Sequence, residues 1–498
     1  MIEGDRAKPG PLFHEQGSDR IKEILKKGRD SLLKKPFSLR QTALEISLES
    51  IKTCSPEYLV RKYFTTAIRK GGLPCSLSET PEIFLLSIGK AAVPMAKAAG
   101  ETLGWEKIAG LVVSRREQGN AVTTLPLELI RAGHPYPDEN SVLAGKTAIE
   151  RLEALKAGIP VLFLVSGGAS SLFEYPKYGL TLECLRGLTE KLLLSGASIE
   201  EINKVRIGLS KVKGGRLLEV AGDRDSLTLI LSDVAGDKIE AIGSGPTVPN
   251  ACNRALEAIE ILRRYRLCGN LEPQLKDFLV REAENWKGND KFPRASHKII
   301  GNNRLLCETA IEKLKTRGFN TLFLGSTISG EAREIGRLLA DLAKEILVSG
   351  HPVQKPAAIV SGGETVVSFK CGQGGVGGPN QEVALSFAIH AADLPETVLI
   401  SMDTDGFDGP TPYAGGVTDG QTWGRIQKCG RDAREDLEQH NSARSLDSAS
   451  ALVVTGSTEN NLNDLRILLV GGPDFRKIAG REGVSDEAKG FRFEKHPG

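Results

Sequence analysis

The feature that most constrains the fold is a repeated pattern of short aliphatic runs, each ending in small residues and leading into a helical pattern. In the first half of the sequence the runs are EIFLLSIGK, IAGLVVS, IPVLFLVSGGASS and SLTLILSDVAGD. Strands that are apolar on both faces and alternate with crossover helices form parallel sheets covered on both sides. The pattern therefore predicts an α/β protein built from doubly wound, mainly parallel sheets.

The same pattern predicts two domains. The pattern stops at about Ala255, and the segment from there to Arg294 has a helical pattern. The strand pattern then resumes with SHKIIGNN, NTLFLGS, AAIVSGGE, TVLISMDTDG and ALVVTGS. A chain of 498 residues is also longer than most single domains. We expect a cleft between an N-terminal Rossmann-like domain and a C-terminal α/β domain. The expected segments are a charged extension (1–37), the N-terminal domain (38–268), a helical connector (269–296), the C-terminal domain (297–472) and a charged tail (473–498).

Charge and cysteine usage exclude several classes of protein. The 65 Lys and Arg residues nearly balance the 63 Asp and Glu residues, which leaves little net field to hold nucleic acid or a membrane surface. The eight cysteines show no CxxC pair and no zinc-type spacing, which indicates reduced thiols in a cytoplasmic compartment. No apolar run approaches the roughly 20 residues that span a bilayer, and the first residues do not resemble a secretion signal. We therefore expect a cytoplasmic protein that acts on small molecules, with a homodimer left open.

Ligands of open parallel sheets bind outside the carboxyl ends of the strands, so the residues after each run are candidates for the site. Lys90 follows the first run, and its flexible stem and compact charge suit it to neutralise a transferring phosphoryl group. A solvated lysine at a helix start is an equally good interpretation of this segment alone. His134 is a candidate for contact with substrate, although a histidine before a proline is more often structural.

A serine-glycine loop follows the third run and predicts anion binding. Its glycines allow a tight turn, and its hydroxyls add to the free N–H groups of the next helix. An ordinary capped turn is the alternative, and the absence of GKS or GKT excludes a Walker A loop. The residues of this loop are Ser166, Gly167, Gly168, Ala169, Ser170 and Ser171. Downstream, Lys213 precedes a glycine pair, which suggests a close backbone approach to polyphosphate.

Carboxylates at strand ends predict a magnesium site. Asp233 ends the fourth run, and magnesium in proteins often needs only one or two protein ligands. Near the C-terminus one loop carries Asp403, Asp405, Asp408 and Asp419. Such a cluster either chelates a metal or consists of solvated turn residues, and the sequence leaves both interpretations open.

Further polar and small residues follow strands of the second half. They are Asn302, Glu364 and the glycines of a loop that includes Gly375 and Gly377. The loop contains a formal GxGxxG, but the next strand ends about thirty residues after the first glycine, whereas a dinucleotide fold needs an acid near twenty. The spacing argues against a nicotinamide site.

Together these segments resemble the glycerate 2-kinase family, whose C-terminal half is called the MOFRL domain. The resemblance covers roughly Ser38 to Val470 in family order and is carried by SIGKAA, AGHPYPDENS, LVSGGASSL, SKVKGGRL, LSDVAGD, IGSGPT, VSGGET, GGPNQEVAL and DTDGFDGPTPYAGG. It implies transfer of the ATP γ-phosphate to the 2-hydroxyl of D-glycerate, with a divalent metal such as Mg²⁺. The products are 2-phosphoglycerate and ADP.

The resemblance also implies roles for individual residues. The family's cleft lysine falls on Lys90, its serine-glycine loop on 166–171 and its basic segment on Lys213. We expect the loop and Lys213 to hold polyphosphate, and Asp233 with Asp405 or Asp408 to act at the metal. Asn302, Gly375 and Gly377 are expected beside the nucleotide, and His134 and Glu364 beside glycerate.

One position departs from the family. Pro379 stands where the family commonly has an arginine, so a charge expected near the phosphates is missing. Arg206, Lys211 and Arg304 are candidates to replace it. The alternatives to a kinase are an NAD(P)H-dependent hydroxypyruvate reductase and a non-catalytic relative that binds a nucleotide or hydroxy acid.

Overall fold

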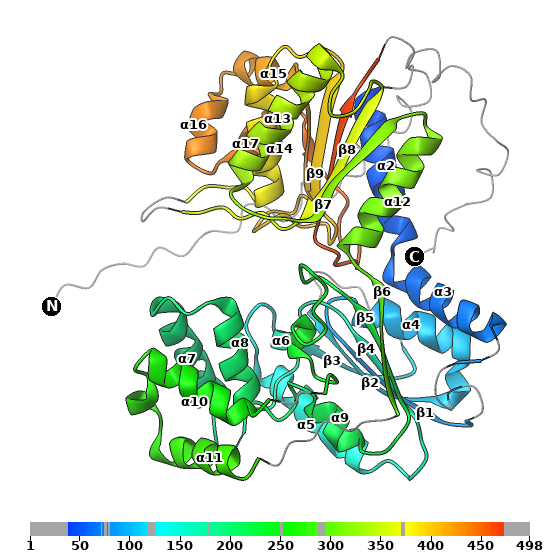
Figure 1. The fold of residues 1–498 in the computed structure, drawn as a ribbon, viewed down its shortest axis with the longest axis vertical. Coiled ribbons are helices and arrows are strands. Elements are labelled where there is room, and N and C mark those ends of the chain that lie inside the picture. Colours follow the sequence, from blue (N-terminus) through cyan, green and yellow to red (C-terminus); the bar gives the residue numbers. More distant parts are fainter. Residues whose placement is uncertain are drawn as a thin grey trace, which may run out of the picture.

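The computed structural model describes residues 38–472 except 71, 74–76, 78–79, 117–124, 178, 250–251, 287–293 and 370–373. The expected extension and tail, residues 1–37 and 473–498, lie outside the described residues. Two lobes are stacked one above the other, each built on a six-stranded sheet (Figure 1). Within the described part of the chain, no helix combines the length and apolar character needed to cross a bilayer. The prediction of an α/β protein with two domains is confirmed.

The first sheet is fully parallel, with strand order β3-β2-β1-β4-β5-β6. Every residue of β1, β4 and β5 is buried, as expected for strands covered on both faces. The order reverses between β1 and β4, so the residues after these two strands lie at the point where such sheets bind ligands. The strands are β1 (Ile83–Ile88), β2 (Ile108–Arg115), β3 (Glu128–Ala132), β4 (Val161–Val165), β5 (Ser226–Leu231) and β6 (Ala295–Gly301).

Helices pack on both faces of this sheet because alternate residues of each strand point to opposite sides. Leu85 of β1 belongs to the apolar cluster on the face of α3 and α4, whereas Leu86 belongs to the cluster on the other face. The covering elements are α3 (Pro56–Arg69), α4 (Ala92–Leu103) and η2 (Trp105–Lys107), and on the other face α5 (Glu139–Glu153), α6 (Ala169–Leu172), α9 (Arg216–Ala221) and η3 (Ile242–Ser244).

A separate group of helices lies beside the first lobe (Figure 1). It has its own apolar core, in which Leu192, Ile202, Leu262 and Leu279 are buried. The group consists of α7 (Leu182–Leu194), α8 (Ile199–Gly208), α10 (Arg254–Arg264), η4 (Cys268–Asn270) and α11 (Pro273–Glu284). Within the expected helical connector 269–296, α11 therefore belongs to this helical group, and residues 295–296 begin β6 of the first sheet.

The second sheet differs from the prediction of a mainly parallel sheet. Its order is β11-β10-β9-β12-β8-β7, and only β7 and β8 pair in parallel, whereas the other four pairs are antiparallel. The last strand, β12, enters between β8 and β9 and runs against both. The strands are β7 (Asn320–Ile328), β8 (Ala357–Gly363), β9 (Thr397–Asp403), β10 (Gly415–Asp419), β11 (Leu452–Val453) and β12 (Asp464–Val470).

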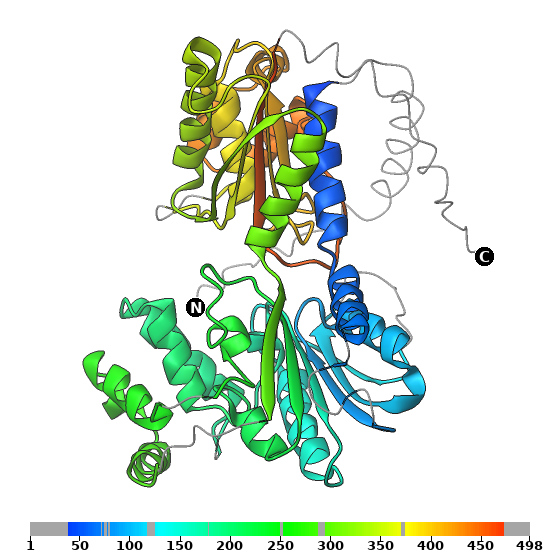
Figure 2. The ribbon, with the colours of Figure 1, turned by 45° about the vertical axis from the view of Figure 1, so that its right-hand side comes forward.

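Helices cover both faces of the second sheet as well (Figure 2). On one face lie α2 (Leu39–Thr53) and α12 (Asn303–Thr316), and on the other α13 (Ala332–Ser349) and α14 (Pro379–His390). Three short helices pack outside α14, namely α15 (Thr422–Lys428), α16 (Ala433–Glu438) and α17 (Ser442–Ser448).

The chain crosses between the lobes twice within these elements. The first helix, α2, packs on α12 and β9 of the second lobe, and the chain enters the first lobe at Ser55, where α3 begins. It returns after β6, which pairs with β5 and so completes the first sheet. The expected domain boundaries at 38 and 297 therefore differ from the lobes, because α2 belongs to the second lobe and β6 to the first.

Candidate active site

A cavity of about 1050 Å³ opens between the lobes at the carboxyl ends of β1, β2 and β3. The first lobe contributes Lys90, Arg115 and His134, which follow or end these three strands. From the second lobe come Asp403, Asp405 and Phe407, which lie at and after the end of β9. The cavity thus brings the strand ends of two separate sheets together.

Lys90 lies in this cavity, as expected for a cleft lysine. Its backbone N–H donates to the carbonyl of Gly167 at 2.9 Å, which joins the turns after β1 and β4. Its Nζ donates to Oδ2 of Asp405 at 3.3 Å, and 19% of the side chain is exposed. A cation of the first lobe is therefore paired across the cleft with a carboxylate of the second.

The serine-glycine loop leaves room for neighbouring side chains to approach one another. A Cβ on Gly167 would lie 1.9 Å from Oδ2 of Asp233, and one on Gly168 would lie 3.1 Å from both the His134 ring and the Lys90 side chain. Gly168 also has a φ of 80°, which L side chains rarely adopt. The two glycines let Lys90, His134 and Asp233 approach the same loop.

The serine hydroxyls of the loop are used inside the protein. Ser166 is fully buried, and its Oγ accepts the N–H of Ala91 at 3.1 Å. Ser171 Oγ donates to the carbonyl of Gly168, and Ser170 Oγ lies 2.8 Å from Oγ of Ser244. These contacts favour a structural role for the serines over the predicted anion cradle.

Lys213 also has an internal role, in contrast to the expected contact with polyphosphate. It is 1% exposed, and its Nζ donates to the carbonyls of Ser170 (2.8 Å) and Phe173 (2.7 Å). The same nitrogen lies 3.2 Å from Oε2 of the buried Glu174. Burial lowers the pKa of Lys213 to about 8. Lys213 therefore holds the serine-glycine loop in place from the interior of the lobe.

Asp233 is held by two asparagines of the second lobe. Asn461 donates to its Oδ2 at 3.0 Å, and Asn463 donates to its backbone carbonyl at 2.7 Å. Burial raises the pKa of the Asp233 carboxyl, and the nearby charge of Lys90 opposes that shift. These asparagines were not predicted from the sequence, and Asn461 and Asn463 lie in the segment TENNLNDL that leads into β12.

The acidic residues at and after the end of β9 divide into those that line the cavity, Asp403 and Asp405, and those that do not. Asp405 faces the cavity, and its Oδ1 accepts the N–H of Phe407 at 2.9 Å. Burial is the main cause that raises the pKa of Asp403 well above its ordinary value, and the charges of Asp405 and Asp464 raise this pKa further. Only part of the predicted acidic cluster is therefore available to a ligand.

Asp408 does not face the cleft and is a poor candidate for the predicted metal ligand. It is 1% exposed, and its two oxygens accept the backbone N–H groups of Asn380 (3.0 Å) and Gln381 (2.8 Å). Burial raises its pKa to about 7. The carboxyl serves the first turn of α14, where free N–H groups need acceptors.

The remaining predicted residues, Asn302, Gly375, Gly377 and Glu364, are not among those that line the interlobe cavity. Asn302 caps α12 by accepting the N–H of Leu305, and it donates to Asp237 at 2.6 Å. Gly375 and Gly377 are packed against another loop, because a Cβ would lie 2.3 Å from the carbonyl of His440 and 2.1 Å from Oγ of Ser442, respectively. These contacts explain both glycines without a bound nucleotide.

Glu364 is exposed and lies within electrostatic reach of the centre. Its pKa is raised by partial burial and then by the charges of Asp464 and Asp233. The charge of Asp233 acts on the Glu364 carboxyl, and both groups carry the hard oxygen donors that magnesium prefers. No group of three or more His, Cys, Asp or Glu side chains within the described residues is arranged to hold a metal by itself. A metal that also binds phosphate oxygens and water needs only one or two such carboxylates.

Arg115 is a cation of the cleft that was not predicted from the sequence. It ends β2, its Nη1 lies 3.9 Å from Oδ2 of Asp405, and its guanidinium lies over the Phe407 ring at 5.5 Å. Its position at the end of a strand beside β1 was the available signal. The three cations considered earlier are occupied elsewhere: Arg206 donates to the carbonyl of Ser170, Lys211 lies over the Tyr175 ring, and Arg304 pairs with Glu308.

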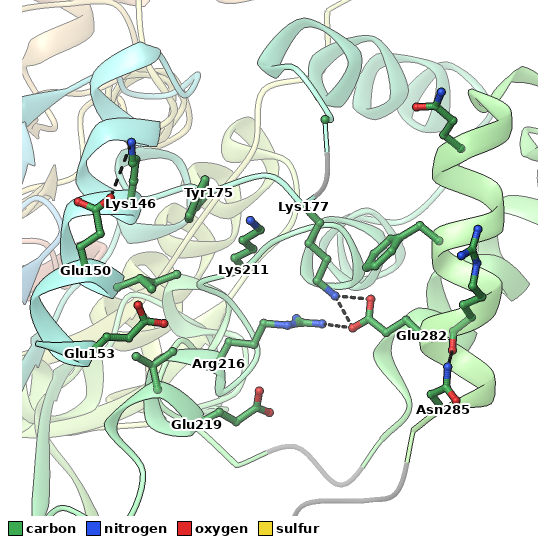
Figure 3. Close-up of a pocket in the computed structure, with 16 residues that line it drawn as sticks. Lys146, Glu150, Glu153, Tyr175, Lys177, Lys211, Arg216, Glu219, Glu282 and Asn285 are labelled. Carbon is green, nitrogen blue, oxygen red and sulfur yellow. Dashed lines mark hydrogen bonds and ion pairs between the residues drawn. The ribbon is translucent and has the colours of Figure 1, made fainter.

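A larger cavity, of about 1140 Å³, lies between α5, α9 and α11 and shares no lining residue with the interlobe cavity (Figure 3). Lys177 and Arg216 both bind the carboxylate of Glu282 there, the latter at 3.0 Å. This carboxylate joins α11 to the rest of the lobe, so the contacts indicate a structural role in which they hold α11 in place. The predicted site residues Lys90, His134 and Asp405 line the smaller cavity instead.

Residues 42–280 match the family described as "Domain of unknown function (DUF4147)", and residues 357–464 match the MOFRL family. A D-glycerate 2-kinase from Thermotoga maritima is 39% identical over 435 residues, which cover 87% of this chain and 99% of the relative. The chain belongs to the glycerate 2-kinase family. A glycerate 2-kinase from Pyrococcus horikoshii is 38% identical over 78% of this chain and 87% of its own length.

A solved structure of a glycerate kinase family member has the same fold. The crystal structure from Thermotoga maritima aligns with a TM-score of 0.78 and 38% identity, covering 87% of this chain and 99% of that one. Within this glycerate 2-kinase family protein, Pro379 is the first residue of α14, a position that favours proline because no N–H is needed there.

Proposed function

We propose that the protein is an ATP-dependent kinase that transfers the γ-phosphoryl group to the 2-hydroxyl of D-glycerate, giving 2-phosphoglycerate and ADP. The observation that carries the proposal is the convergence of Lys90, Asp233 and Asp405 at facing strand ends of two lobes. Phosphoryl transfer depends mainly on alignment and on neutralising the negative charge of the phosphates. A lysine among carboxylates in an interlobe cavity supplies both requirements.

The proposed reaction joins the 2-hydroxyl oxygen to the γ-phosphorus of ATP. The bond from that phosphorus to the bridging oxygen breaks, and ADP leaves with the electron pair. Lys90 binds the phosphoryl oxygens and offsets their charge. Asp405, which contacts Lys90, orients the 2-hydroxyl and takes its proton.

The remaining carboxylates are assigned to a divalent cation. Asp233, together with Glu364, would hold Mg²⁺ or a similar ion, which supplies further neutralisation of the phosphates when bound. Asn461 and Asn463 hold Asp233 in place from the other lobe. The position of Asp233 is thus tied to the relative placement of the two lobes.

A coupled assay of ADP release with D-glycerate, ATP and Mg²⁺ tests the proposal, and ³¹P NMR identifies the phosphorylated position of the product. Lys90→Ala is expected to lower kcat by at least ~100-fold, a loss typical of removing a group that stabilises transition-state charge. Lys97→Ala is the matched control, because Lys97 follows on α4 and is an exposed lysine paired with Glu57. Its kcat should stay within a factor of two or so.

The reductase alternative gives a different result in a parallel assay. Oxidation of NADH or NADPH by hydroxypyruvate should not exceed the blank if the proposal is right. Turnover of the reduced cofactor without glycerate-dependent ADP release would contradict it. Binding of ATP or glycerate without any turnover would instead support the non-catalytic alternative.

A further inference from the structure

We propose that Arg115 binds the carboxylate of the hydroxy-acid substrate and thereby selects the 2-hydroxyl over the 3-hydroxyl for phosphorylation. This inference rests on the proposed kinase function and adds to it a specificity-determining residue. It concerns the part of the cleft beside Lys90, on the side of β2 and β3.

The first observation is that the backbone of Arg115 is fixed at the rim of the cavity. Arg115 ends β2 and pairs with Ala132 of β3, and its carbonyl accepts a hydrogen bond from Arg131 at 3.2 Å. On the other side β1 pairs with β2, and the N–H of Gly89 donates to the carbonyl of Val113. The ends of three neighbouring strands therefore hold Lys90 and Arg115 side by side.

The second observation is that the guanidinium still has donors to offer. Its contacts with the second lobe are long, at 3.5 Å to Oγ of Ser457 and 3.9 Å to Oδ2 of Asp405. A guanidinium carries five N–H donors in a planar fork, and these contacts engage only part of them. The Phe407 ring, 5.5 Å away, supports the plane of the group, and 26% of the side chain is exposed.

The third observation is that two cations of the first lobe face one carboxylate of the second. Lys90 and Arg115 share Asp405 as their anionic partner across the cleft. His134, beside them, stays neutral at pH 7, because burial and the charges of Lys90 and Arg115 lower its pKa to about 4. A ligand carboxylate would give this pair of cations a second anionic partner, and an arginine fork matches a carboxylate through two parallel hydrogen bonds.

The distances then explain the choice of hydroxyl. Nζ of Lys90 and Nη1 of Arg115 lie 3.3 and 3.9 Å from the same oxygen of Asp405, so both cations surround one acceptor. In glycerate the 2-hydroxyl is on the carbon bonded to the carboxylate, whereas the 3-hydroxyl is one carbon farther away. A carboxylate on Arg115 therefore brings the 2-hydroxyl to Asp405, next to the phosphoryl group at Lys90.

The test compares Arg115→Met, Arg115→Lys and wild type in kinetics with D-glycerate and with glycerol, which lacks the carboxylate. Arg115→Met should raise KM for glycerate by roughly 10- to 100-fold, the effect of losing a charge-assisted hydrogen-bonded pair, with a smaller change in kcat. The preference for glycerate over glycerol should fall, and ³¹P NMR should detect 3-phosphoglycerate. Arg115→Lys, which keeps the charge but loses the fork, should be intermediate.

Arg304→Ala serves as the control, because Arg304 is an exposed arginine that pairs with Glu308 on α12. An unchanged KM for glycerate and an unchanged product in Arg115→Met would overturn the inference, as would a rise in KM for ATP alone. Calorimetric titration with glycerate in the absence of nucleotide separates this inference from the kinase proposal. Binding that is weakened in Arg115→Met supports Arg115 even without turnover, and equal binding by both proteins refutes it. Absence of binding to wild type also refutes it.

Discussion

Lys213 offers the sharpest test of how the cleft is built. Its burial predicts a structural role, whereas its sequence context predicts contact with polyphosphate. In Lys213→Met the buried carboxylate of Glu174, which is 0% exposed, loses its nearest cation at 3.2 Å. The next one, Arg206, lies 4.0 Å away. Removing one partner of a buried ion pair typically costs about 3–5 kcal/mol, because the other charge stays buried without compensation. The carbonyls of Ser170 and Phe173 lose a donor in the same step.

For a unit of roughly 200 residues each kcal/mol lowers Tm by about 2–4 °C, so Lys213→Met should melt about 6–20 °C below wild type. Circular dichroism on heating measures this shift. Lys213→Met combined with Glu174→Gln removes both charges and should recover most of the loss. If Tm were unchanged while KM for ATP rose, Lys213 would contact polyphosphate and would not have the structural role.

Two further predictions concern the convergence around the serine-glycine loop. Gly167→Ala should abolish ADP release, because the added Cβ would lie 1.9 Å from Oδ2 of Asp233 and must displace it; retained kcat would contradict the close approach. His134 has a pKa of about 4 against an ordinary 6.5, so it should stay neutral down to about pH 4. Because this folded-state pKa is depressed, the stability that the neutral ring contributes is present above pH 6.5 and is lost as pH falls towards 4. NMR titration of the His134 ring should show the low pKa, and it should rise in Arg115→Met; a value near 6.5 in wild type would refute the argument.

The sequence predicted the strand ends well, because runs that are apolar on both faces are a local signal. Lys90 and Asp233 were singled out in this way, since each follows such a run, and both contact the second lobe. The direction of the strands in the second sheet could not be found in the same way. β12 enters between β8 and β9 through long-range pairing that no local pattern encodes.

Burial of charged residues is the other property that the sequence does not reveal. Lys213 and Asp408 carry the residue types of a phosphate and metal site, but their partners come from distant segments such as Glu174 and the start of α14. Arg115 was overlooked for the opposite reason, because its strand ends in charged residues without the glycines that mark the other turns. Which charges face a ligand depends on tertiary contacts.

The two crossings of the chain are the backbone connections between the lobes, and together they form a hinge. Two backbone tethers permit rotation about the line that joins them and resist twisting or separation of the halves. Asn460 donates to the carbonyl of Cys54 at the first crossing. The next residue, Asn461, donates to Asp233. Rotation of the lobes at this crossing would therefore move Asn461 and change its contact with Asp233 at the proposed metal site. A single cut in the gene cannot separate the halves into two intact fragments. A piece that ends at residue 301 would carry α2 with Ala43 and Ile46 stripped of their cover, and the complementary piece would lack that helix.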